Sequence, residues 1–204
     1  MSLDVRPMSH DDLGEVVAVH RAAFTKHLMT FFGPRFLRLF YAFVIDSPRG
    51  VTYVATIDGN VAGFVAGVLK PTRFYRRFLF WRAPLVALAL IPPIVRRPET
   101  IVRIARRVVQ RTSGNGVHLP GAELMSLAVV PGQQHHGIGA ALVRQFVNRV
   151  HERGVPALWL ATDDADNDEV KTFYEHLGFE KRRAFTNAEG RALAEYARSS
   201  EPIE

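Results

Sequence analysis

The chain has 204 residues, of which 48% are apolar, so it can bury a core of its own and fits one domain spanning residues 1–204. It contains no cysteine, which excludes disulfides, thiolate metal sites and a cysteine nucleophile. The net charge of +6 is concentrated, because residues 70–112 hold eleven Lys or Arg against the single acid Glu99. A local basic patch favours a phosphate-bearing partner or an anionic lipid surface over nucleic acid, for which no signature motif is visible.

The first half of the chain predicts a strand, two helices and a hairpin. Residues 3–7 form a short strand, and Asp11 or Asp12 begins a helix that runs to about Ala23. A second helix starts at Pro34, since proline suits the first helical turn. The segments 51–57 and 61–69 flank an Asp-Gly-Asn turn that tolerates positive φ, which indicates a hairpin.

The second half alternates between strands and helices. Strands are expected at 123–130, 156–162 and 179–185, with a weaker final strand over 190–200; helices are expected from about His136 to Arg153 and over 167–177, where Gly178 ends the helix. This order favours an α/β domain of the α+β type, with helices flanking a mixed, mostly antiparallel central sheet. The polar first twelve residues lack the apolar core of a secretory signal, so we expect a cytoplasmic protein.

Three glycines occur where the strand at 123–130 is followed by the next helix, in the stretch GQQHHGIGA at 132–140. A helix N-terminus presents unpaired N–H groups and a partial positive charge, and glycine lets an anion approach the main chain. Ile138 and Gly139 stand where a nucleotide-hydrolysing loop needs lysine and a hydroxyl, and Leu142 stands where a dinucleotide fingerprint needs glycine. Both of these phosphate motifs are therefore disfavoured.

The run Gln134-His135-His136-Gly137-Ile138-Gly139 resembles the acyl-CoA pyrophosphate loop of the GNAT superfamily of N-acetyltransferases. Asn167, seven residues before Tyr174 in NDEVKTFYEHLGF, is similar to a second segment of that family at its usual spacing. The resemblance covers residues 120–180, extends loosely to the N-terminal hairpin, and is absent from 70–118. It implies the GNAT fold, acetyl-CoA as co-substrate, and a primary amine as the small-molecule acceptor.

The resemblance also implies which residues hold acetyl-CoA. Main-chain amides of the loop would bind the pyrophosphate, and the loop residues are Gln134, His135, His136, Gly137, Ile138, Gly139 and Ala140. The strand would pair with the pantetheine arm through Leu127, Ala128 and Val129. Asn167 would bind that arm as well. Two simpler alternatives stay open: the glycines allow close packing, and Asn167 caps its helix. Adjacent histidines without helical spacing or cysteine do not predict a metal site.

Tyr174 is the candidate general acid, because a phenol beside the sulfur can protonate the departing thiolate. Its alternative role is packing, since Phe173 and Leu177 are apolar neighbours on the same helix. Glu123 is the candidate base, in a place similar to the catalytic glutamate of histone-type members, although a glutamate at a strand start is commonly solvated. We expect one face of the strand to carry Glu123, Met125, Leu127 and Val129.

Residues 70–118 form a basic helical insertion. Residues 100–111 predict a basic amphipathic helix, and the uncharged run 83–95 is too short for a membrane span and is broken at Pro92-Pro93. Three interpretations compete: a flap that packs on the domain or on a second subunit of a homodimer, a docking element for an anionic membrane, and a capture site for a phosphorylated acceptor.

The sequence therefore predicts transfer of an acetyl group from acetyl-CoA to a primary amine in a ternary complex, since neither a cysteine nor a Gly-x-Ser-x-Gly motif is available for a covalent intermediate. A faint similarity of 20–41 and the insertion to amino-sugar enzymes of the family suggests an amino sugar, or its nucleotide- or lipid-linked form, as acceptor. The alternatives are a protein N-terminus or lysine, and a catalytically silent acyl-CoA-binding module.

Overall fold

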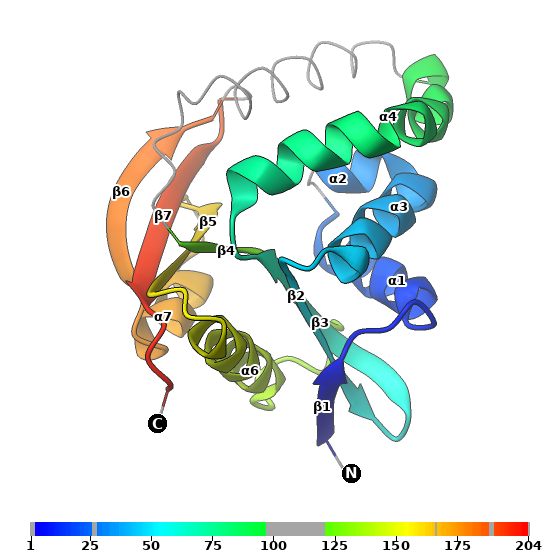
Figure 1. The fold of residues 1–204 in the computed structure, drawn as a ribbon. Coiled ribbons are helices and arrows are strands. Elements are labelled where there is room, and N and C mark those ends of the chain that lie inside the picture. The colour runs from blue at the N-terminus through cyan, green and yellow to red at the C-terminus, as the bar shows by residue number, and fades with distance from the viewer. Residues whose placement is uncertain (1–2, 26–27, 97–120, 166, 188–189, 204) are drawn as a thin grey trace.

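Seven strands form one sheet in the order β1-β2-β3-β4-β5-β7-β6 in the computed structural model, which describes residues 3–25, 28–96, 121–165, 167–187 and 190–203 (Figure 1). Within these described residues, only β4 and β5 run parallel, and all other neighbouring strands are antiparallel. This arrangement confirms the predicted fold class. The strands are β1 (Leu3–Pro7), β2 (Gly50–Ile57), β3 (Asn60–Val68), β4 (Ala122–Val129), β5 (Ala157–Asp163), β6 (Glu180–Thr186) and β7 (Ala192–Ser199).

Helices cover both faces of this sheet, and each face has its own apolar core. One core lies under α1, α3 and α4, and the other lies under α6 and α7 (Figure 1). In α3 the buried side chains recur with the period of a helix, at Phe36, Leu37, Phe40, Tyr41 and Val44. The helices are α1 (Leu13–Ala23), α2 (Leu28–Phe31), α3 (Gly33–Asp46), α4 (Pro71–Arg96), α6 (Ile138–Glu152) and α7 (Asp168–His176).

A β-bulge at Met125 interrupts β4. The residues on either side of Met125 pair with consecutive residues of β3, so Met125 itself has no partner there. Because the extra residue shifts the side-chain alternation, Met125 packs with the core under α1, α3 and α4, whereas Leu127 and Val129 pack with the core under α6. The prediction of a single face for Glu123, Met125, Leu127 and Val129 was therefore wrong.

The strands β4 and β5 separate soon after they meet. Ala122 pairs with Leu158 and Glu123 pairs with Trp159, and no further pair joins the two strands in this described part of the chain. Beyond these pairs, β4 continues beside β3 and β5 continues beside β7 as far as Asp163. The facing main-chain groups of both strands are therefore not used by the sheet, although each is an obligatory donor or acceptor.

α4 is one continuous helix that packs against α3. Pro92 and Pro93 lie within it, so the prediction that they break the apolar run was wrong. The fixed φ of proline is compatible with a helix, and the cost is the hydrogen bond that each missing N–H would have made. The amphipathic helix predicted over 100–111 lies outside the described residues. Across the described ranges, no helix combines the length and apolar character that crossing a membrane requires.

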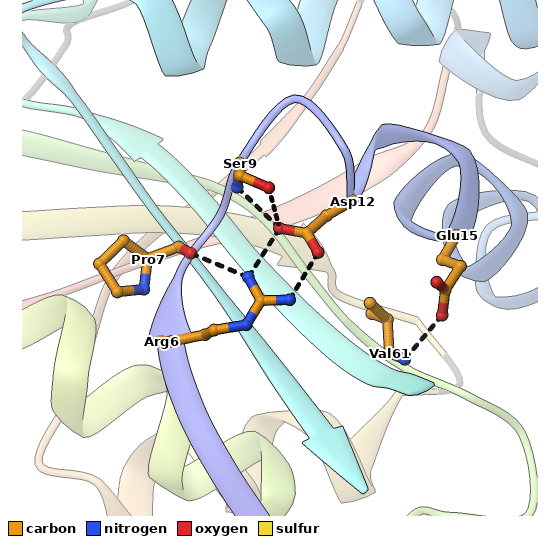
Figure 2. Close-up of polar contacts among 6 residues, drawn as sticks. All are labelled: Arg6, Pro7, Ser9, Asp12, Glu15 and Val61. Atoms are coloured by element: carbon orange, nitrogen blue, oxygen red, sulfur yellow. Dashed lines mark hydrogen bonds and ion pairs between the residues drawn. The ribbon is translucent and has the colours of Figure 1, made fainter. Parts of the chain in front are cut away.

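The start of α1 is held by an ion pair rather than by a helix cap. Asp12 occupies the N-cap position, as predicted, but its side chain makes no capping bond. Its carboxylate instead accepts bonds of 2.7 and 2.9 Å from the Arg6 guanidinium and of 2.7 Å from the Ser9 N–H (Figure 2). Glu15 accepts a 2.7 Å bond from the Val61 N–H, which fastens α1 to β3 (Figure 2).

The Asp12 ion pair makes stability depend on pH in the acid range. Hydrogen bonds from Arg6, and then from Ser9, lower the pKa of Asp12 from 3.8 to about 2. The stabilisation is complete above the unfolded pKa of 3.8 and is lost as the pH falls through about 2. Asp12→Asn is therefore expected to lower the free energy of unfolding by roughly 1–2 kcal/mol at pH 7, with the difference vanishing towards pH 2.

Urea titrations at pH 7, 4 and 2.5 measure this difference. The control is Asp11→Asn, because Asp11 is exposed next to Asp12. An equal loss of stability in both variants at pH 7 would contradict the assignment.

Candidate active site

A cavity of about 390 Å³ occupies the opening between β4 and β5. Its walls come from β4 and β5, and it is completed by α1, the following loop, α7 and the start of β7. The residues that line it are His20, Ala23, Phe24, Met29, Glu123, Leu124, Met125, Ser126, Leu127, Leu160, Ala161, Thr162, Asp163, Asn167, Val170, Tyr174, Arg191 and Leu193. The structure thus brings predicted residues of two separate segments to one cavity: Glu123 and Leu127 of β4, and Asn167 and Tyr174 of α7 and its N-cap.

Glu123 lies where the opening begins, at the last pair that joins β4 to β5. Only 6% of the residue is exposed, so it is not the solvated glutamate that the sequence left open. The Tyr75 hydroxyl of α4 donates a 3.3 Å hydrogen bond to its Oε1. A carboxylate in such a place is able to accept a proton from a group bound in the cavity.

Tyr174 projects from α7 into the same cavity and is 6% exposed. Its ring packs edge-on against Phe173 and Phe179, with centroids 5.1 and 5.5 Å away. Burial raises the pKa of Tyr174, so its phenol stays protonated at neutral pH. The packing role and the proton-donor role are therefore compatible in one residue.

The glycine-rich loop adopts the backbone conformation that its sequence allows. Gly132, His135 and Gly137 have φ of 90°, 65° and 74°, and Gly137 is the N-cap of α6, so this helix begins two residues later than predicted. The N–H groups of Ile138, Gly139 and Ala140 lie in the first turn of α6, where the helix itself provides no acceptor for them. Such a row of N–H groups at a helix N-terminus can bind a phosphate.

Contacts hold this loop beside α7. A Cβ on Gly139 would lie 3.3 Å from the Phe173 ring, so glycine also permits close packing here, as the simpler alternative required. His135 Nδ1 lies 3.3 Å from a Glu169 oxygen, and His136 Nδ1 lies 2.8 Å from the Gln134 carbonyl oxygen. The two histidines thus have separate partners, and the described residues contain no group of three or more His, Asp or Glu that could hold a metal ion.

Asn167 holds the end of β5 rather than the start of α7. It occupies the N-cap position of α7, but its side chain makes no capping bond. Its Nδ2 donates bonds of 2.9 Å to Thr162 Oγ1 and 3.1 Å to the Asp163 carbonyl. The alternative that Asn167 merely caps its helix was therefore wrong, and its side-chain oxygen remains an acceptor beside the cavity.

The predicted strand residues lie along the open side of β4. Leu127 pairs with Val65, Ala128 with Phe64, and Val129 with Gly63, all in β3. The edge of β4 opposite β3 faces the opening towards β5. Main-chain groups of residues 127–129 on this edge can therefore hydrogen-bond to a bound molecule.

Sequence analysis did not identify a buried series of hydrogen bonds that ends at the cavity. His20 Nδ1 lies 2.7 Å from the Tyr41 oxygen, and the Tyr41 hydroxyl donates a 3.2 Å bond to Ser126 Oγ. Burial raises the pKa of Tyr41, which keeps this hydroxyl protonated. Arg191, also missed, donates three hydrogen bonds to the Asp163 carboxylate, of 3.1 Å from Nε and of 2.5 and 2.6 Å from Nη2. No local motif marks these residues, because their partners are far away in the sequence.

Comparisons with known proteins identify relatives of the chain. The model of the Acetyltransferase (GNAT) family matches residues 20–179. The [Ribosomal protein bS18]-alanine N-acetyltransferase of Escherichia coli (strain K12) is 35% identical over 79 residues, which are 37% of this chain and 53% of that protein. The chain thus matches about half the length of such curated relatives.

Solved structures extend the similarity to nearly the whole chain. The crystal structure of the Escherichia coli ribosomal-protein-S18-alanine N-acetyltransferase has a TM-score of 0.59 at 16% identity, covering 97% of this chain and 94% of the other. The PaiA N-acetyltransferase of Thermoplasma acidophilum, solved in complex with coenzyme A, has a TM-score of 0.58 at 13% identity, covering 96% and 98%. At these identities the likeness establishes a common fold.

Proposed function

We propose, because the chain belongs to the GNAT acetyltransferase family, that it transfers an acetyl group from acetyl-CoA to a primary amine by direct attack. The observation that carries the proposal is the meeting of Glu123 and Tyr174 in one cavity, at an opening of the sheet with unpaired main-chain groups. The loop at 134–140 adds a row of N–H donors beside α7.

In this proposal acetyl-CoA lies across the opening as a substrate. The N–H groups of 134–140 bind its pyrophosphate, and the pantetheine arm pairs with the free edge of β4 at 127–129. The Asn167 side-chain oxygen accepts from an amide of that arm, since its nitrogen already serves Thr162 and Asp163. The thioester then points towards Glu123 and Tyr174.

The proposed reaction uses these two residues in sequence. The Glu123 carboxylate takes a proton from the acceptor ammonium, and the neutral nitrogen attacks the thioester carbon to form the C–N bond. A main-chain N–H of β4 near Leu127 stabilises the oxyanion. The oxyanion re-forms the carbonyl as the C–S bond breaks, and Tyr174 donates its proton to the thiolate of coenzyme A. The nitrogen of the new amide releases its second proton to solvent, and the phenol regains a proton from solvent.

The acceptor class is the finer part of the proposal. An amino sugar, free or linked to a nucleotide or lipid, follows from the faint resemblance in the N-terminal helices and the insertion. A protein N-terminus is the second candidate, and the partial similarity to an alanine N-acetyltransferase of a ribosomal protein favours it. A lysine side chain and a silent acyl-CoA-binding module are the remaining alternatives, and a cytoplasmic location stays a prediction.

Thiol release from acetyl-CoA tests this function. The amine panel contains glucosamine, a UDP-linked amino sugar, a peptide with N-terminal alanine, and an N-blocked peptide whose one amine is lysine. We expect release to rise with one class of amine and to follow its concentration. If calorimetry shows acetyl-CoA binding but no amine stimulates thiol release, the protein is a silent acyl-CoA-binding module. If neither acetyl-CoA binding nor thiol release is observed, the whole proposal is contradicted.

A further inference from the structure

α4 carries apolar side chains on the face that points away from the protein. Phe74, Phe78, Val86, Ala89 and Leu90 are buried against the core. Other apolar side chains of the same helix are largely exposed: Phe80 (80%), Val95 (76%), Trp81 (66%), Leu88 (63%), Ile91 (52%) and Leu85 (43%). A helix that is apolar on both sides normally has a partner on both sides, and single domains rarely expose such a continuous patch.

Helical geometry places this patch on one outward stripe. At 100° per residue, Phe80, Leu88, Ile91 and Val95 fall within about a quarter of the helix circumference, on the side away from Phe78. In Figure 1, α4 lies at the edge of the molecule above α3. The helix of 26 residues has a length of about 39 Å, and the stripe runs from Phe80 to Val95.

The first turns of α4 present arginines instead. A cavity of about 410 Å³ beside them is lined by Arg49, Arg73, Arg77 and Arg82, and also by Trp81. In the described chain, no carboxylate pairs with Arg73 or Arg77. The acid in this cavity, Asp46, already lies 2.7 Å from His10 and 3.5 Å from Arg82. The cavity is therefore a basic site suited to an anionic group such as a phosphate.

We propose that α4 docks the protein on an anionic phospholipid surface. Arg73 and Arg77 bind lipid phosphates, and the outward apolar stripe enters the boundary with the acyl chains. Trp81 lies between the two, where an amphipathic ring is favoured. A phospholipid has this same order of anionic group and apolar chain, and α4 contains no acidic residue to oppose it.

Vesicle binding tests the proposal with the full chain. The intensity and wavelength of tryptophan fluorescence report the contact, because the chain has two tryptophans, and Trp159 is buried whereas Trp81 is exposed. Vesicles of phosphatidylcholine with about 30% phosphatidylglycerol are expected to shift the emission to shorter wavelength. Pure phosphatidylcholine vesicles are expected to bind at least about tenfold more weakly.

Two variants separate the charged and apolar parts. Arg73→Gln with Arg77→Gln, and separately Phe80→Ser with Leu88→Ser, are each expected to weaken vesicle binding by about tenfold or more. Arg144→Gln is the control, since Arg144 is an exposed arginine on α6, across the sheet from α4 (Figure 1). Circular dichroism melts check that each variant is folded.

Three results would overturn the proposal. One is no emission shift with anionic vesicles, and another is binding that the Arg144 variant weakens as much as the α4 variants do. The third is a dimer in light scattering that Phe80→Ser with Leu88→Ser converts to a monomer, because the stripe would then join two copies of the chain. None of these results bears on acetyl transfer, which is measured separately.

Discussion

Tyr174→Phe is expected to lower kcat for acetyl transfer by about 10² or more, which is the usual contribution of a positioned acid or base. The change removes only the hydroxyl, so the ring keeps its packing against Phe173 and Phe179. The dissociation constant of acetyl-CoA should change by less than about threefold, because the loop amides and the β4 edge are unaffected. Stopped assays of thiol release and calorimetry measure the two quantities.

The matched control for this change is Tyr196→Phe. Tyr196 is also buried, at 1% exposure, but it lies outside the cavity and donates to Glu175. Its variant should keep kcat within about twofold even if stability falls by about 1 kcal/mol through the lost hydrogen bond. A normal kcat in Tyr174→Phe would remove the residue from the mechanism and leave it a packing role.

Gly137→Val is expected to weaken acetyl-CoA binding by about tenfold or more, equivalent to about 1.4 kcal/mol. Gly137 has φ of 74°, which a β-branched residue adopts only at a cost of about 1–3 kcal/mol. Relaxation of this strain would turn the adjacent N–H groups away from the pyrophosphate. A Cβ at this position meets no atom within 4 Å, so the backbone conformation rather than a clash at Cβ is tested.

Gly154→Val provides the control, because Gly154 has a similar φ of 66° and similarly open space. It lies just beyond the other end of α6, away from the loop. Calorimetry on both variants should show weak binding for Gly137→Val and nearly normal binding for Gly154→Val. Equal affinities would show that the loop amides do not hold the substrate.

The order of elements and the loop at 132–140 follow from local sequence. Glycine at positive φ, proline in the first turn of α3 and the alternation of the hairpin each act within a few residues. The motif Gln134-x-x-Gly-x-Gly and the later residues Asn167 and Tyr174 are likewise recognised by their spacing along the chain. For this reason the amino-acid sequence is sufficient to indicate the family and the candidate residues.

The way β4 presents its residues depends on contacts between distant segments. The bulge at Met125 depends on pairing with β3, and it separates Met125 from Leu127 in a way that a period of two does not predict. The opening after Glu123 depends on β5, which is more than thirty residues away. Long-range pairing also buried Glu123 beside Tyr75 and gave Asn167 its partners in β5.

Tertiary contacts also determine which side of α4 is buried and which side is exposed. Its composition gives no amphipathic pattern, because apolar residues occur all around the helix. Packing on α3 chose one side for the core and left the other side exposed. The composition of a helix determines how much apolar surface it has. Tertiary packing determines which part of that surface stays exposed and can contact another molecule.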